Sequence, residues 1–175
     1  MHHTRTAALP AAGAVLLLAG CGTSPRPNAP AAGSPAATQG TAASTPLDAS
    51  AALKAISTTV TTARLTGVVT AENDGNHLLG RPNQYTSKVT FADSRISKAD
   101  TAYFKKGDVE LGGGVEVFTS QADAEARAKY IQAVTKSIPA LVEYDYVHGA
   151  TVVRVSQLLT PTQAGEYKTA AAKLG

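Results

Sequence analysis

The stretch Glu143-Tyr-Asp-Tyr-Val-His-Gly-Ala-Thr-Val-Val-Arg-Val155 predicts a β-hairpin. Its two halves, 143–147 and 151–155, are rich in aromatic and β-branched residues, which favour strands. His148-Gly149 lies between them as a plausible hairpin turn. Hairpins join antiparallel strands, so we expect the sheet of the folded region to be mainly antiparallel.

Helix starts flank this hairpin on both sides. Ser120, followed three residues later by Asp123, is an acidic variant of the capping box and predicts a helix to about Ser137. The spacing also favours an ion pair between Asp123 and Arg127. The expected apolar stripe of this helix is Ala124, Ala128, Ile131, Val134 and Ile138.

The last helix follows Thr160-Pro161-Thr162-Gln163, which combines a cap, proline at the first helical position and glutamine at the third. Its inward residues are expected to be Ala164, Tyr167, Ala171 and Leu174. An earlier helix is predicted over 49–59, where Leu53, Ile56 and Val60 are three and four residues apart and Asp48 or Ser50 can cap.

Several strands are predicted between the first two helices. Arg64 to Thr70 is one, and the alternation in 85–91 is another. In that half-buried strand, Tyr85, Ser87, Val89 and Phe91 would share one face, with Thr86, Lys88 and Thr90 on the other. Residues 103–111 suggest a further hairpin, and Gly112-Gly-Gly114 a bulge or turn before a strand over 115–118.

The order of helix, strands, helix, hairpin and helix predicts an α+β fold. We expect a mainly antiparallel sheet with helices packed on one face. Residues 48–175 would form this single domain, because about 125 residues suit one hydrophobic core.

The chain contains one cysteine, Cys21, directly after Leu18, Ala19 and Gly20. This order resembles the lipobox of bacterial lipoproteins, in which a diacylglyceryl group is attached to the cysteine. Residues 1–20 then form a lipoprotein signal peptide. The apolar run over 7–18 spans about 18 Å as a helix, short of the roughly 30 Å hydrocarbon core, so it does not predict a transmembrane helix.

Residues 21–47 are expected to be the lipidated cysteine and a disordered tether. They are rich in Ala, Pro, Gly, Ser and Thr, a composition that cannot bury enough apolar surface to fold. Together the two segments predict an extracytoplasmic domain anchored to the cell membrane through lipid.

The folded region also resembles small secreted lipoproteins of actinobacteria. The residues that carry the resemblance are 76–88 (Asn-His-Leu-Leu-Gly-Arg-Pro-Asn-Gln-Tyr-Thr-Ser-Lys), 113–118, 143–149 and 159–167. Asp74-Gly75-Asn76 departs from the Asp-Pro-Asn usual in that group. The resemblance implies location and fold, since the group has no assigned activity.

No catalytic, metal or cofactor motif is found. After removal of the signal peptide only His77 and His148 could supply imidazole, and no serine has the spacing of a nucleophile elbow. Residues 72–76 offer oxygen ligands but lack the twelve-residue calcium loop, so turn formation explains them better. Nucleic acid is not expected as a partner of an exported chain without clustered basic residues.

The candidate ligand-binding residues are His77, Arg81, Tyr85 and Lys88, because an Arg fork beside Tyr and Lys can hold a carboxylate or phosphate. The alternative is that Arg81 caps carbonyls and Tyr85 belongs to the core. The sequence favours a non-catalytic domain that binds or scaffolds an envelope protein or polymer. Two alternatives stay open: a cell-envelope hydrolase with an unrecognised site, and an immunity-type lipoprotein that occludes a surface receptor.

Overall fold

The computed structural model of this protein describes residues 47–175. The predicted signal peptide, the lipobox with Cys21, and all of the predicted tether except Leu47 fall within residues 1–46, outside the described residues. In residues 47–175, none of the helices has both the length and the apolar character needed to cross a membrane.

The described chain is an α+β domain, as predicted. Its five strands form one sheet in the order β1-β2-β3-β5-β4, and every neighbouring pair is antiparallel. The elements are α1 (Ala49–Thr59), β1 (Ala63–Val68), β2 (Ser87–Asp93), η1 (Val109–Leu111), β3 (Gly112–Val117), α2 (Gln121–Thr135), η2 (Pro139–Leu141), β4 (Glu143–His148), β5 (Thr151–Ser156) and α3 (Pro161–Ala171).

The predicted helix starts are confirmed, because each depends on a local cap. The Asp48 side chain accepts a hydrogen bond from the amide of Ala51 at the start of α1. Ser120 accepts from the amide of Asp123 at the start of α2. Thr160 and Gln163 form a complete capping box at α3.

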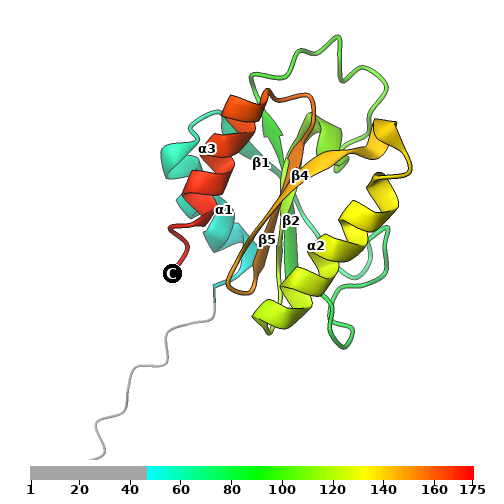
Figure 1. The fold of residues 1–175 in the computed structure, drawn as a ribbon, viewed down its shortest axis with the longest axis vertical. Helices are drawn as coiled ribbons and strands as arrows, with labels where there is room; N and C mark the ends of the chain where they lie inside the picture. The colour runs from blue at the N-terminus through cyan, green and yellow to red at the C-terminus, as the bar shows by residue number, and fades with distance from the viewer. Residues whose placement is uncertain (1–46) are drawn as a thin grey trace, which may run out of the picture. The chain divides into compact units, whose positions relative to one another are not determined.

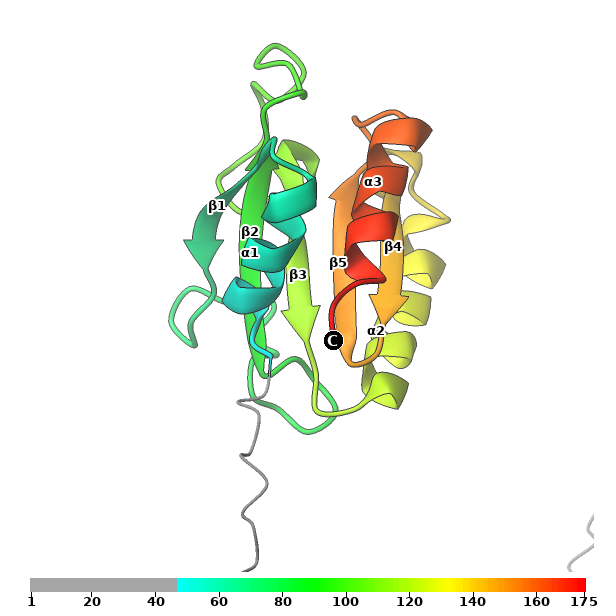
Figure 2. The same cartoon turned by 90° about the vertical axis from the view of Figure 1, so that its left-hand side faces the viewer.

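The helices cover both faces of the sheet, which corrects the expectation of one face. In Figure 1 the sheet is seen nearly edge-on, with α1 and α3 on one side and α2 on the other, and Figure 2 shows α1 and α3 in front of the strands. Val153 and Val155 of β5 lie in the core under α1 and α3, whereas Val152 packs with Ala124 of α2. Because β3 is buried along its whole length and β5 along nearly all of it, both faces need a cover.

The three consecutive glycines belong to β3, and the predicted bulge or turn at these positions is wrong. They pair with residues 90–92 of β2. A Cβ atom at Gly113 would lie 2.1 Å from the carbonyl oxygen of Arg154 and 2.5 Å from Cζ of Phe91. Glycine is therefore required because neighbouring backbone and an aromatic ring approach this position too closely for any side chain.

The predicted hairpin over 103–111 does not form. Tyr103 is 95% exposed and pairs with no strand, and Val109–Leu111 is a 3₁₀ turn. Between them, the Asp108 carboxylate accepts a hydrogen bond from the amide of Lys105 at 2.7 Å. This local side-chain contact satisfies the backbone without a partner strand.

Tyr85 lies on the opposite face from the one predicted. Regular pairing begins only at Ser87, and Tyr85 packs with Phe118 in the core beneath α2. Val89 and Phe91 do lie in the other core, as expected. The strand is also buried on both faces rather than half-buried.

The variant Gly113→Ala should lose about 3 kcal/mol of unfolding free energy, the upper end of the usual cost of overpacking, because a clash with backbone cannot be relieved by moving a side chain. Denaturant unfolding followed by circular dichroism measures this loss.

Gly165→Ala is the matched control, since nothing lies within 4 Å of a Cβ at this helical glycine. Alanine in the middle of α3 should stabilise the domain by roughly 0.5–1 kcal/mol. Equal effects of the two substitutions would contradict the packing argument.

Candidate functional site

A pocket of about 400 Å³ opens on the face of the sheet that carries α2. Strands β2, β3 and β5 supply its floor, α2 one wall, and the segment just before β3 another. Gly114 leaves the floor open because it has no side chain. Its position belongs to the same face of β3 as Glu116, two residues later. A volume of this size suits a small-molecule ligand.

Three basic side chains line the pocket, and all are largely buried. They are Lys88 from β2, Arg154 from β5 and Arg127 from α2. Their common partner is the carboxylate of Glu116, which is wholly buried and does not itself line the pocket. The Lys88 Nζ and Arg127 Nε atoms each lie 2.9 Å from a Glu116 oxygen, and Arg154 Nη1 lies at 3.3 Å.

Arg154 links this group to a second carboxylate, that of Glu143 on β4. Its Nε and Nη2 donate to the two oxygens of Glu143 at 2.6 and 2.8 Å, the bidentate geometry in which arginine holds a carboxylate most firmly. Arg127 pairs with Glu116 across the helix–sheet interface, and not with Asp123 as its helical spacing predicted. We call Lys88, Glu116, Arg127, Glu143 and Arg154 the ionic cluster.

Burial opposes the ionisation of Glu116, but Lys88, Arg154 and Arg127 outweigh it and hold its pKa at about 2. Asp145, on β4 beside the cluster, behaves in the opposite way. Burial and the neighbouring Glu143 carboxylate raise the pKa of Asp145 to about 8. Neither of its buried carboxyl oxygens has a hydrogen-bond partner within residues 47–175.

Two properties mark the ionic cluster as the candidate site. Buried ion pairs rarely stabilise a fold relative to apolar packing, because desolvation of the charges offsets their attraction. Strongly shifted pKa values beside a cleft are characteristic of functional sites. Within the ionic cluster, three cations face two carboxylates, so these five side chains together carry one surplus positive charge.

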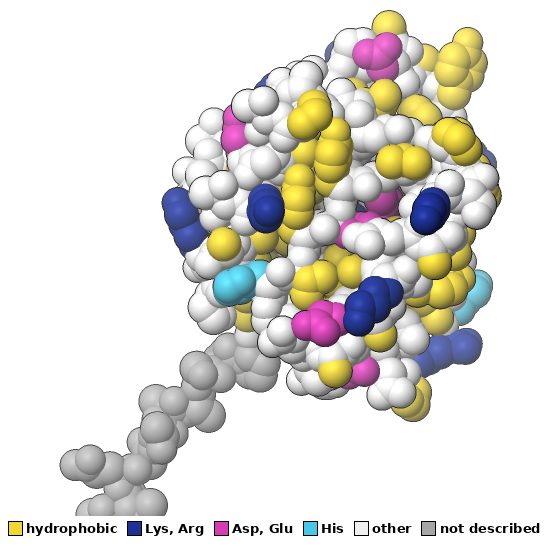
Figure 3. Space-filling model, viewed as in Figure 1, with side chains coloured by type: hydrophobic (Ala, Val, Ile, Leu, Met, Phe, Trp, Pro, Cys, Tyr) yellow, Lys and Arg dark blue, Asp and Glu magenta, His cyan; other side chains and the backbone are white. Residues whose placement is uncertain are grey.

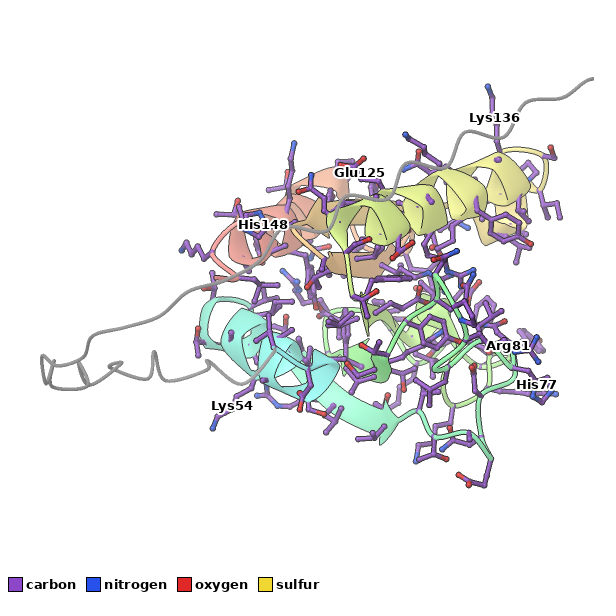
Figure 4. The ribbon with its side chains drawn as sticks, turned by 90° about the horizontal axis from the view of Figure 1, so that it is seen from below. Lys54, His77, Arg81, Glu125, Lys136 and His148 are labelled. Atoms are coloured by element: carbon purple, nitrogen blue, oxygen red, sulfur yellow. The ribbon has the colours of Figure 1, made fainter. Side chains whose placement is uncertain are left out.

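The structure does not bring the four predicted ligand residues together. His77 and Arg81 lie on the exposed loop between β1 and β2, and their side chains point outward in Figure 4. Tyr85 is buried and donates its hydroxyl to Asp74 at 2.7 Å. Of the four, only Lys88 lines the pocket.

In the oxygen-rich turn at residues 72–76, the Asp74 carboxylate is already engaged in hydrogen bonds within the domain. The Asp74 carboxylate accepts the amides of Leu78 and Leu79 at 2.8 and 2.9 Å in addition to the Tyr85 hydroxyl. Burial opposes its ionisation, but these donors hold the pKa of Asp74 at about 2. Among the described residues, no group of His, Cys, Asp and Glu is arranged to hold a metal ion.

The face drawn in Figure 3 shows no cluster of basic side chains that would suggest a second binding site. There the Lys and Arg side chains stand apart from one another, separated by neutral and hydrophobic groups. The two histidines lie on opposite sides of the domain in Figure 4. Neither His77 nor His148 lines the pocket.

Glu116, Arg127 and Arg154 are site residues that were not predicted from the sequence. A usable pattern was present, because Lys88, Glu116 and Arg154 are each a single long charged residue inside a predicted strand. The register places Lys88 directly opposite Glu116, and Arg154 opposite Gly114. That register depends on contacts between distant parts of the chain.

Comparisons with protein families, with curated protein sequences and with solved structures found no match to this chain.

The raised pKa of Asp145 predicts how its replacement changes stability with pH. An unfolded aspartate has a pKa of about 3.9, so the stability due to protonated Asp145 is full below about pH 4 and is lost as the pH rises to about 8. Asp145→Asn remains neutral. The unfolding free energy of the variant, relative to wild type, should therefore increase between about pH 5 and pH 8.

Urea unfolding at the two pH values measures this difference. Asp100→Asn, at an exposed position, is the control and should show no such change. A constant difference between Asp145→Asn and wild type would mean that Asp145 is already ionised in the folded protein.

Proposed function

We propose that this chain is an exported lipoprotein, held at the outer face of the cell membrane through Cys21, whose folded domain binds a small ligand of the cell envelope in the ionic pocket. The ionic pocket is the space lined by Lys88, Arg127 and Arg154. The observation that carries the binding function is that these cations line a cavity while their shared partner, Glu116, lies beneath it.

The geometry favours binding because the donors are fixed before any ligand arrives. Each cation is held by at least one carboxylate, so little side-chain freedom is lost on association. A hydrolase would need a general base or nucleophile facing the pocket. Three carboxylates do line the pocket, those of Glu143, Asp108 and Glu110. Glu143 is already held by Arg154, and no histidine in residues 47–175 forms an ion pair with a carboxylate, so no paired general acid and base faces the pocket.

The membrane location is supported by the sequence Leu18-Ala19-Gly20-Cys21 and by the Pro-, Ala- and Ser-rich segment that follows it. A single acyl chain holds a protein only marginally, whereas the two chains of a diacylglyceryl group give stable attachment. The anchor would keep the pocket close to lipids and envelope components.

Cys21→Ala should release the protein from the membrane fraction, because the thiol that accepts the lipid is removed. Fractionation with immunoblotting, and mass spectrometry of the wild-type N-terminus, measure the effect. Ser24→Ala is the control and should remain attached. A wild-type protein that carries an unmodified Cys21 would contradict the anchoring proposal.

Ligand binding is tested by thermal unfolding of the whole chain against a panel of small envelope metabolites and organic acids, bases and alcohols. A ligand present at about 100 times its Kd should raise the unfolding free energy by about 2.7 kcal/mol. Gly114→Leu should abolish the protection, since the new side chain projects into the pocket floor.

Gly165→Ala, far from the pocket in α3, should be protected as wild type is. Protection that persists in Gly114→Leu would place the ligand elsewhere. If no compound protects wild type, the binding proposal itself fails.

A further inference from the structure

We propose that the ionic pocket takes a monocarboxylate with an apolar body of several carbons, its carboxylate held by Lys88 and Arg127. This assignment rests on the binding function proposed above and names the class of ligand. It depends on three features of the pocket: unused donors, a single surplus charge, and an apolar wall.

The unused donors belong to Lys88 and Arg127. An ammonium group has three N–H donors, and Lys88 uses one of them in its ion pair with Glu116. Arg127 binds Glu116 through Nε and Nη2, which leaves Nη1 without a partner among residues 47–175. Since both side chains line the pocket and Glu116 does not, these N–H groups are open to an acceptor that enters the pocket and replaces water.

The charge of the cluster limits that acceptor to about one negative charge. Three cations of the cluster face the carboxylates of Glu116 and Glu143, and two further carboxylates, Asp108 and Glu110, line the pocket outside the cluster. A bound monoanion would complete the neutralisation of the buried charges. A phosphate dianion would exceed it, and would also approach Glu143, Asp108 and Glu110, which line the same pocket.

The apolar wall defines the rest of the ligand. Ile131 and Val134 of α2, with Leu141 of η2 and Val109 of η1, line the pocket near the charged floor. Val134 and Leu141 are 41% and 43% exposed, although Val134 was expected on the buried stripe of the helix. An alkyl or other apolar chain that extends from the carboxylate would cover these side chains and remove them from water.

Octanoate is the probe, tested on the whole chain by isothermal titration calorimetry and by two-dimensional NMR of the labelled protein. Acetate tests whether the apolar body is needed, and octanol tests whether a charge is needed. Octylammonium tests whether the ligand charge must be negative, and octyl phosphate tests whether a larger negative charge is accepted. We expect octanoate to bind about tenfold or more tightly than each of the others. The largest amide shifts should occur at Gly113, Gly114 and the second half of α2.

Lys88→Met should weaken octanoate binding about tenfold or more, while Lys54→Met, on the exposed side of α1, should leave it unchanged. If Lys88→Met does not fold, the amide shifts of the wild-type protein still locate the ligand. Gly114→Leu provides a second variant that changes the cavity and leaves the charges intact.

If octyl phosphate, octanol or octylammonium binds more tightly than octanoate, the carboxylate assignment is overturned. The proposed binding function is still supported by that result. Octanoate shifts confined to other surfaces would also overturn the assignment. Failure of the whole metabolite panel to protect the protein is a different result, and it would remove the proposed function together with this inference.

Discussion

The carboxylate of Glu116 connects four elements of the domain at one buried point. It belongs to β3 and receives ion pairs from Lys88 of β2, Arg154 of β5 and Arg127 of α2. Without this acceptor, three cations would remain buried beneath a helix, which is far more unfavourable than the absence of the whole group. Together with the apolar contacts of Ala124 and Ala128, this carboxylate therefore fixes where α2 lies over the sheet and shapes the pocket between them.

Most of the fold could be predicted from the sequence, because caps and hairpin turns act over a few residues. The starts of α1, α2 and α3 follow from Asp48, Ser120 and Thr160. The β4–β5 hairpin was also predicted, although its turn lies at residues 149–150, one residue later than expected. The errors arose where distant segments meet. Read locally, the glycines of β3 indicate a break in the strand. The close approach of the Arg154 backbone and the Phe91 ring to Gly113 explains why they lie in a central strand instead.

The candidate site was much less predictable than the fold. The alternating pattern correctly predicted that Lys88 and Val89 lie on opposite faces of β2, since neighbouring side chains in a strand point to opposite faces. It failed for Tyr85, which precedes the regular strand and hydrogen-bonds to Asp74. The partners of Lys88 come from β3, β5 and α2, and no short-range rule gives the register that joins them.

Gly113 and Gly114 are neighbours in sequence but face opposite sides of the sheet. The first is enclosed by Phe91 and by the backbone of β5, whereas a Cβ at the second meets only the carbonyl oxygen of Val89, at 3.2 Å. A side chain at position 114 therefore needs only a small shift of one neighbouring carbonyl, whereas none can be accommodated at position 113. Of two adjacent glycines, one is required by the sheet, and the other sets the depth of the pocket floor.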